Sequence, residues 1–132
     1  MNQVRIFTET GSFHTDERGW AFFPFGRDLG PGPSGLDLRS LHVVKTEPGA
    51  VRGNHLHPAA AEWLHIFGGE YTLYYEEQGQ IRSTVLNRED QVIFLPPGTP
   101  HAVKNTGPGP IFLVAFREEP AAAPHTLSHP LV

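Results

Sequence analysis

Turn-forming residues interrupt this chain at short intervals along its whole length. Its 132 residues include 13 prolines and 14 glycines, several of them adjacent, as in Gly-Pro-Gly-Pro-Ser-Gly at 30–35. Proline lacks an amide donor and glycine favours tight turns, so both oppose long helices. No window of helical length shows apolar residues at a period of 3.6. Roughly ten short strands are therefore expected, which favours an all-β barrel or a two-sheet jelly roll.

Stretches rich in β-branched and aromatic residues mark the expected strands. Residues 1–35 should hold N-terminal strands, at 4–8 and 20–25, and a glycine- and proline-rich loop that packs on the barrel. The barrel is expected over residues 36–117. Residues 118–132 are expected to form a tail that is loosely ordered or draped across the sheet or a partner subunit. The expected barrel strands include 38–46, 63–67, 70–76, 81–86, 91–95, 101–105 and 111–117.

Two histidines and a glutamate lie close together near the middle of the chain. Side chains alternate faces along a strand, so His55 and His57 should project side by side. Pro58 then interrupts regular pairing, and Glu62 opens the apolar run 63–67. If Glu62 faces the same side as the histidines, a carboxylate and two imidazoles converge at the mouth of an apolar interior. Such a donor set suits a divalent metal ion.

A third histidine begins a later strand. His101 follows Pro-Pro-Gly-Thr-Pro at 96–100, a rigid turn that limits the backbone ahead of the imidazole and so preorganises it. A small barrel can bring this strand close to His55, which makes His101 the fourth candidate ligand. The chain has no cysteine, so any metal must be held by imidazole and carboxylate groups.

The spacing of these residues resembles the two sequence motifs of the cupin superfamily. The first motif is matched by Gly49, His55, His57, Glu62 and Gly69. The second is matched by Pro96, Gly98, His101 and Asn105, with Asp90 in place of its first glycine, in a turn where aspartate is tolerated. The resemblance implies a double-stranded β-helix and one divalent metal ion (Zn, Mn, Fe or Ni). The implied ligands are His55, His57, Glu62 and His101.

A narrower resemblance connects the chain with cupins of nucleotide-sugar metabolism. These include 3,5-epimerases, 3,4-ketoisomerases and the cupin domain of bifunctional capsular-sugar enzymes. The matching elements are Asp-Glu-Arg-Gly at 16–19 and Arg52-Gly53 ahead of the first histidine. The 3,5-epimerases work without a metal and have glutamine where this chain has His57. The capsular-sugar type, which can hold zinc, is therefore more similar.

Three neutral imidazoles and one carboxylate would give a divalent metal site a net charge of +1 and leave two positions of a six-coordinate ion open. Such a site can bind a substrate oxyanion and act as a Lewis acid at a carbonyl. The main hypothesis is a metal-dependent isomerase or epimerase that acts on a sugar or nucleotide-sugar. The alternatives are a non-catalytic cupin that binds a sugar or another small molecule, such as a carboxylate, and an Fe(II)-dependent dioxygenase.

Several residues outside the ligand set are candidates for contact with the substrate. Arg52, Tyr71 and Phe94 are the expected substrate-binding residues, because a guanidinium suits a phosphate or carboxylate and aromatic rings can line a pocket. His42, Tyr71 and Tyr75 are the candidates for the base.

Large apolar residues on the strand after Glu62 point to a buried outer surface. Trp63 and Phe67 share the face opposite Leu64, and such a stripe is costly to leave in water. We expect a second sheet or a partner subunit to cover it, and the resemblance to cupins favours a homodimer. Alternation turns His65 outward or into an interface.

Charge and hydropathy limit the remaining partners. The formal net charge is −4 and no basic face stands out, so we expect no nucleic-acid partner. No signal peptide or transmembrane segment is recognisable, so we expect no membrane partner and a cytoplasmic location.

Overall fold

The computed structural model describes residues 3–8, 12–25, 40–118 and 126–132. Within these ranges it contains twelve strands and no helix, and hence no helix that could cross a membrane. The strands are β1 (Arg5–Thr8), β2 (Phe13–Asp16), β3 (Gly19–Phe22), β4 (His42–Thr46), β5 (Val51–Leu56), β6 (Ala61–Phe67), β7 (Tyr71–Glu77), β8 (Gln80–Leu86), β9 (Gln91–Leu95), β10 (His101–Asn105), β11 (Ile111–Glu118) and β12 (Leu127–Ser128).

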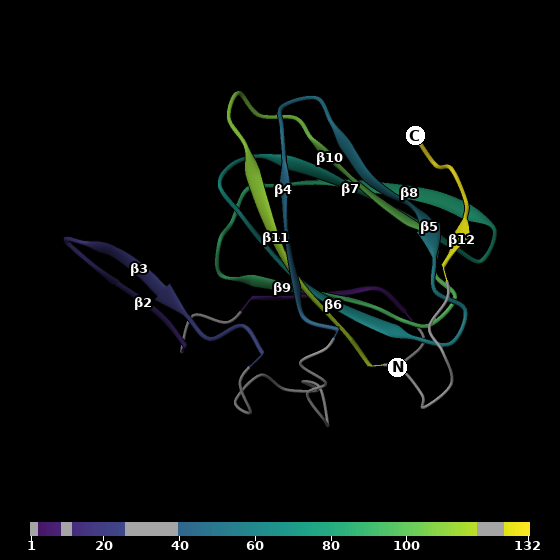
Figure 1. The fold of residues 1–132 in the computed structure, drawn as a ribbon, viewed down its shortest axis with the longest axis horizontal. Coiled ribbons are helices and arrows are strands. Elements are labelled where there is room, and N and C mark those ends of the chain that lie inside the picture. Colours follow the sequence, from purple (N-terminus) through teal and green to yellow (C-terminus); the bar gives the residue numbers. More distant parts are fainter. Residues whose placement is uncertain (1–2, 9–11, 26–39, 119–125) are drawn as a thin grey trace.

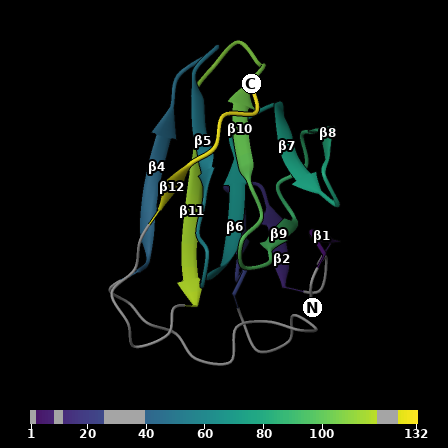
Figure 2. The same cartoon turned by 90° about the vertical axis from the view of Figure 1, so that its right-hand side faces the viewer.

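Two five-stranded antiparallel sheets form the body of the molecule (Figures 1 and 2). One has the order β1-β9-β6-β11-β4 and the other the order β12-β5-β10-β7-β8. Neighbouring strands are mostly distant in sequence, as in β6 beside β11, so the sheets form by long-range pairing. The expected all-β jelly roll is confirmed.

The structure differs from the expected strand list near both ends of the chain. Residues 20–25 were expected to form one aromatic strand, but β3 ends at Phe22. It pairs with β2, a strand that was not expected. The short strand β12 lies in the expected tail. The expected loop at 26–37, the start of the expected strand at 38–46 and residues 119–125 of the tail lie outside the described residues.

The main core lies between the two sheets and follows from strand alternation. On β6 the inner face carries Leu64 and Ile66, which are buried against residues of the other sheet such as Leu73 and Val103. Glu62 lies on the same inner face of β6, because it precedes Leu64 by two residues and side chains alternate along a strand. The apolar core therefore continues into the polar cluster described below.

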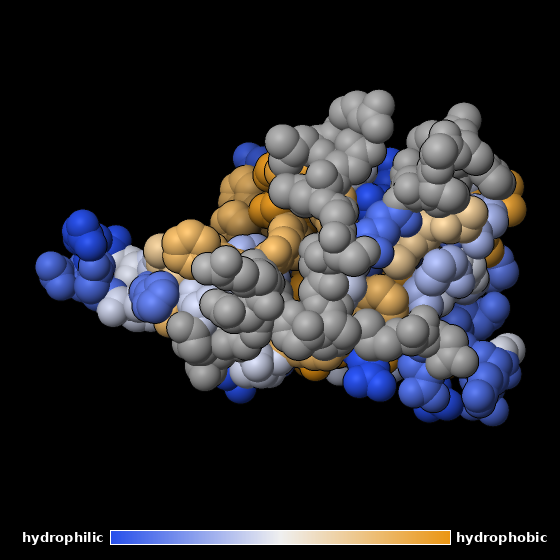
Figure 3. Space-filling view, turned by 90° about the horizontal axis from the view of Figure 1, so that it is seen from below, coloured by the Kyte–Doolittle hydropathy of each residue, from blue (hydrophilic) through white to orange (hydrophobic). Residues whose placement is uncertain are grey.

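The opposite face of β6 is covered within the chain. Trp63 packs against Phe94 in a second buried cluster. The β2–β3 hairpin contributes Phe22, whose ring centroid is 4.8 Å from that of His65, and Trp20, which is 5.4 Å from Phe67. Figure 1 shows this hairpin projecting from the sheets, and Figure 3 shows hydrophilic residues at its tip. His65 thus faces outward on its strand, as expected, but lies under aromatic rings of the same chain.

Asn105, buried at the end of β10, joins two backbone segments, the end of β4 and the turn at 107–109. Its Nδ2 donates to the carbonyls of Thr46, at 2.9 Å, and Gly109, at 2.8 Å. Its Oδ1 accepts a bond from the amide of Gly107 at 3.0 Å. The side chain is 1% exposed, so water cannot readily replace these bonds.

Replacing Asn105 with alanine is expected to lower the free energy of unfolding by about 1–3 kcal/mol, because buried carbonyls lose their donor. Chemical denaturation checks this value. Asn87→Ala, at an exposed position, is the matched control and should change stability by less than about 0.5 kcal/mol. Equal effects of the two substitutions would contradict a bridging role for Asn105.

Candidate metal centre

Three histidines from two neighbouring strands converge on one point between the sheets. His55 lies on β5, His57 follows the end of that strand, and His101 opens β10. His55 and His101 are direct partners in the antiparallel pairing. One ring nitrogen from each of the three histidines lies within 4.8 Å of the others. The structure therefore brings together three of the four expected ligands, as strand alternation and the jelly roll predict.

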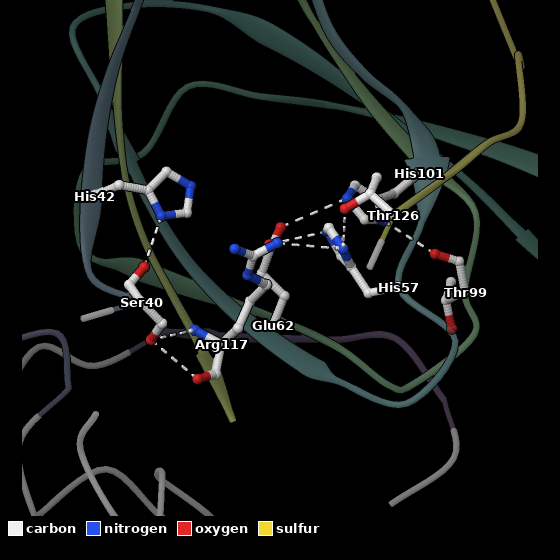
Figure 4. A network of polar contacts seen from close by, with 8 residues as sticks. All are labelled: Ser40, His42, His57, Glu62, Thr99, His101, Arg117 and Thr126. Atoms are coloured by element: carbon white, nitrogen blue, oxygen red, sulfur yellow. Dashed lines mark hydrogen bonds and ion pairs between the residues drawn. The ribbon is translucent and has the colours of Figure 1, made fainter. Parts of the chain in front are cut away.

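Glu62 supplies the carboxylate of this cluster from β6 in the opposite sheet (Figure 4). Its two oxygens lie 3.3 Å from Nε2 of His57 and 3.5 Å from Nε2 of His101. Burial alone would raise the pKa of Glu62, since only 6% of the residue is exposed. Contact with His101 and His57 outweighs burial and holds this pKa well below its usual range, so the group is an anion.

The ring nitrogens that face Glu62 fit a metal ion. Nε2 of His57 and Nε2 of His101 are buried, and apart from these contacts with Glu62 neither nitrogen has a hydrogen-bond partner among the described residues. A buried polar atom without a partner is costly, and a bound cation would satisfy both nitrogens. His101 is also oriented for ligation, because its Nδ1 lies 2.9 Å from the carbonyl of Thr99. A proton on Nδ1 bonds that carbonyl and leaves the lone pair of Nε2 directed into the cluster.

His55 completes the set in the protonation state that ligation needs. Burial, followed by the charges of His101 and His57, lowers the pKa of His55 to about 4. The imidazole is therefore neutral near pH 7 and has a lone pair available for a metal.

Gly53 permits the close approach of β5 to β10 that aligns the histidines. Its φ is +97°, in the region that favours glycine. A Cβ at this position would lie 2.8 Å from the carbonyl oxygen of His101. The pairing of the two strands also shifts in register between His101 and Ala102. Gly53 thus lies at the irregularity that brings His55 opposite His101.

The cluster forms part of the wall of a cavity of about 380 Å³ between the sheets. Apolar residues of the main core, such as Leu64 and Val103, also line it. Polar lining comes from His42, Arg52, Arg117 and Thr126. A cavity with apolar walls and a few convergent polar groups suits a small-molecule ligand.

The polar wall residues are held in different ways. Nδ1 of His42 lies 2.7 Å from the carbonyl of Ser40. Nη2 of the exposed Arg52 donates to the carbonyl of Lys45 at 3.0 Å. Nη1 of Arg117 lies 3.4 Å from Nδ1 of His57. The cavity therefore combines an anionic carboxylate, four histidines and two guanidinium groups.

The structure does not bring two of the expected substrate-binding residues to this cavity. Tyr71 is 1% exposed within the main core, and burial raises the pKa of its phenol far above the usual range. Phe94 is 5% exposed and packs on Trp63 in the outer cluster. Tyr75 packs against the main core and is not part of the lining. Only Arg52 of the expected substrate contacts and His42 of the expected bases line the cavity.

Two polar lining residues, Arg117 and Thr126, were missed by sequence reasoning. Arg117 lies on β11, directly opposite Glu62 in the pairing with β6, and alternates inward with Ala115 and Leu113. That alternation was readable in the sequence. Thr126 comes from the C-terminal segment, and no local pattern marks it.

A family model described as a cupin domain matches residues 42–116, a span that contains the three histidines and Glu62. No curated protein matches the chain.

Several solved structures share the fold at low sequence identity. A dTDP sugar isomerase from Desulfovibrio desulfuricans superposes with a TM-score of 0.77 at 15% identity, covering 96% of this chain and 83% of that one. A 3,4-ketoisomerase from Thermoanaerobacterium thermosaccharolyticum, in complex with TDP-4-keto-6-deoxyglucose, gives 0.74 at 12% identity, covering 96% and 87%. A TDP-quinovose 3,4-ketoisomerase from Campylobacter jejuni gives 0.69 at 18% identity, covering 98% and 95%.

Proposed function

This chain belongs to the cupin family, and we propose that it is a metal-dependent isomerase acting on a nucleotide-linked keto sugar. The observation that carries the proposal is the convergence of three histidines and Glu62 on one wall of a cavity whose other polar residues include a further histidine. The structural likeness to 3,4-ketoisomerases, one of them in complex with TDP-4-keto-6-deoxyglucose, supports this substrate class.

The residues of the cluster would hold the ion, and those around it would orient the substrate. His55, His57, His101 and Glu62 are the proposed ligands, and a bound divalent ion would act as a Lewis acid at the substrate carbonyl. Arg52 is exposed at the cavity, so its planar guanidinium can pair with a diphosphate or carboxylate there. The apolar wall then excludes water from the reacting carbons.

His42 is the proposed base. An isomerisation of this class moves a proton between neighbouring carbons of the sugar, so it needs a group that first accepts and then returns that proton. If Nδ1 of His42 donates to the carbonyl of Ser40, Nε2 carries a lone pair that can accept it. Figure 4 shows the ring apart from the metal cluster, so the base and the ligands are separate groups.

Replacing His42 with alanine is expected to reduce kcat at least about 100-fold, the range of general base catalysis. The affinity for metal should stay within about threefold, because His42 is not in the cluster. Steady-state kinetics and a zinc titration separate the two effects. A variant that keeps its kcat would exclude His42 as the base.

The proposed function is tested with TDP-4-keto-6-deoxyglucose and protein loaded with zinc, manganese, iron or nickel. NMR should show the carbonyl moving to a neighbouring carbon, and a chelator should stop the reaction. Tight binding without turnover would favour a non-catalytic sugar-binding cupin. Consumption of oxygen by the iron form would favour a dioxygenase.

A further inference from the structure

The C-terminal segment, residues 126–132, lies along the strand that carries the histidines. Strand β12 pairs with β5, with Leu127 opposite Leu56 and Ser128 opposite His55. Figure 2 shows the yellow segment running beside β5 toward the C-terminus. This part of the tail is thus draped across the sheet, one of the two arrangements expected from the sequence.

Asn54, the residue just before His55, anchors this segment. It has a φ of +56°, a conformation that asparagine tolerates better than most residues. Its Oδ1 accepts bonds from the amides of Leu131, at 2.8 Å, and Val132, at 3.3 Å. Its Nδ2 donates to the carbonyl of Val132 at 3.0 Å, and its own carbonyl accepts from the amide of His129 at 2.7 Å. Four hydrogen bonds therefore hold the segment to one residue.

The same segment delivers a hydroxyl group to His57. Oγ1 of Thr126 lies 3.1 Å from Nδ1 of His57, on the side of the ring away from Glu62 (Figure 4). The other neighbour of this nitrogen is Nη1 of Arg117, at 3.4 Å. A guanidinium has only donors, whereas a hydroxyl can accept.

Which of these two neighbours forms a hydrogen bond with Nδ1 of His57 depends on which ring nitrogen carries the proton. Ligation through Nε2 requires a lone pair there, so the proton must sit on Nδ1. That N–H needs an acceptor, which Arg117 cannot provide. Among the described contacts of this nitrogen, only Thr126 supplies one.

We propose that Thr126 is a positioning residue for the metal site: its hydroxyl accepts a hydrogen bond from the Nδ1–H of His57 and so directs Nε2 of that ring to the metal. Asn54 holds the segment in place for this contact. The inference rests on the proposed metal site and adds the C-terminal segment to it. Thr126 thereby supports the metal centre from a position far in sequence from either histidine motif.

The expected effect of removing the hydroxyl is about a tenfold loss of metal affinity. Partners that orient a metal-bound histidine typically contribute 10- to 100-fold, roughly, to affinity. The lower end applies because Thr126 is exposed, and water can partly replace the lost acceptor.

Zinc affinity of the full chain, measured by competition with a chromophoric chelator, tests the proposal. Thr126→Val should bind zinc about tenfold more weakly than the wild type, and Thr126→Ser, which keeps the hydroxyl, should recover most of that loss. Asn54→Gly, which tolerates the same φ, should also weaken binding. Ser128→Ala, at an exposed position on β12, is the matched control and should match the wild type.

Three outcomes separate the possible failures. If wild type binds zinc and Thr126→Val binds within twofold of it, the positioning role is overturned while the metal site stands. If valine and serine weaken binding equally, the hydroxyl is not the cause and the proposal also fails. If wild type itself takes up no zinc, the proposed metal site fails and this inference with it. Melting of metal-free Thr126→Val and Thr126→Ser should match wild type, because the contact with His57 matters only to ligation.

Discussion

Replacing His57 with alanine is expected to weaken binding of a divalent metal ion by more than about 100-fold, because a direct ligand contributes more than the 10- to 100-fold of its outer partners. Alanine removes the Nε2 atom that lies 3.3 Å from Glu62. It leaves the apolar core between the sheets intact, since His57 is not part of that core. The variant should therefore remain folded. A zinc competition titration and circular dichroism measure the two properties.

His14→Ala is the matched control for this experiment. His14 is an exposed histidine on β2, outside the cluster, so its loss should leave zinc affinity unchanged. An unchanged affinity in His57→Ala would remove His57 from the ligand set. Global unfolding of His57→Ala would instead mean that the metal has a structural role.

Gly53→Ala is expected to destabilise the fold by about 3 kcal/mol or more, through both backbone strain and overpacking. The left-handed φ of +97° disfavours any residue with a Cβ. The added carbon would also meet the backbone carbonyl of His101 at 2.8 Å, and this backbone atom is held in the sheet. Relief of the clash moves β5 away from β10, so zinc affinity should fall as well. Chemical denaturation and the zinc titration measure both effects.

Gly79→Ala separates strain from overpacking. Gly79 has a φ of +74°, but a Cβ there would meet nothing within 4 Å. Its replacement should cost only about 1–2 kcal/mol, the cost of the left-handed conformation, and should not affect zinc binding. If Gly53→Ala and Gly79→Ala lose the same stability and bind zinc equally well, Gly53 is not needed for the close approach of β5 to β10.

The convergence of the three histidines and Glu62 was predictable because each part follows from a local rule. The i, i+2 spacing places His55 and His57 on the same side of the chain, and the turn at 96–100 ends directly at His101. Inner-face alternation then places Glu62 with Leu64 on β6. Local rules do not predict which distant strands pair, and that part of the prediction came from the expected jelly-roll fold.

The residues that line the cavity were less predictable because they depend on which face of a strand points into it. Tyr71 lies in the core between the sheets but does not line the cavity, and Phe94 lies in the outer cluster. An aromatic residue on a strand suits either face, so composition does not separate a core ring from a pocket ring.

The remaining differences arise from contacts between segments that are remote in sequence. Trp20 and Phe22 cover His65 only because the β2–β3 hairpin folds over β6, and no local pattern specifies that. Thr126 reaches His57 because Asn54 binds the chain end. Such contacts depend on tertiary placement rather than on propensity or periodicity.

The most direct test of the metal centre is anomalous diffraction from crystals of the full chain grown with zinc. We predict one strong peak per chain, about 2.0–2.2 Å from an imidazole nitrogen of His57 and of His101 and from a Glu62 oxygen, with His55 completing the set. A zinc peak at His14 or His129 would contradict the account. A well-ordered histidine cluster without a zinc peak, in crystals grown with zinc, would contradict it as well.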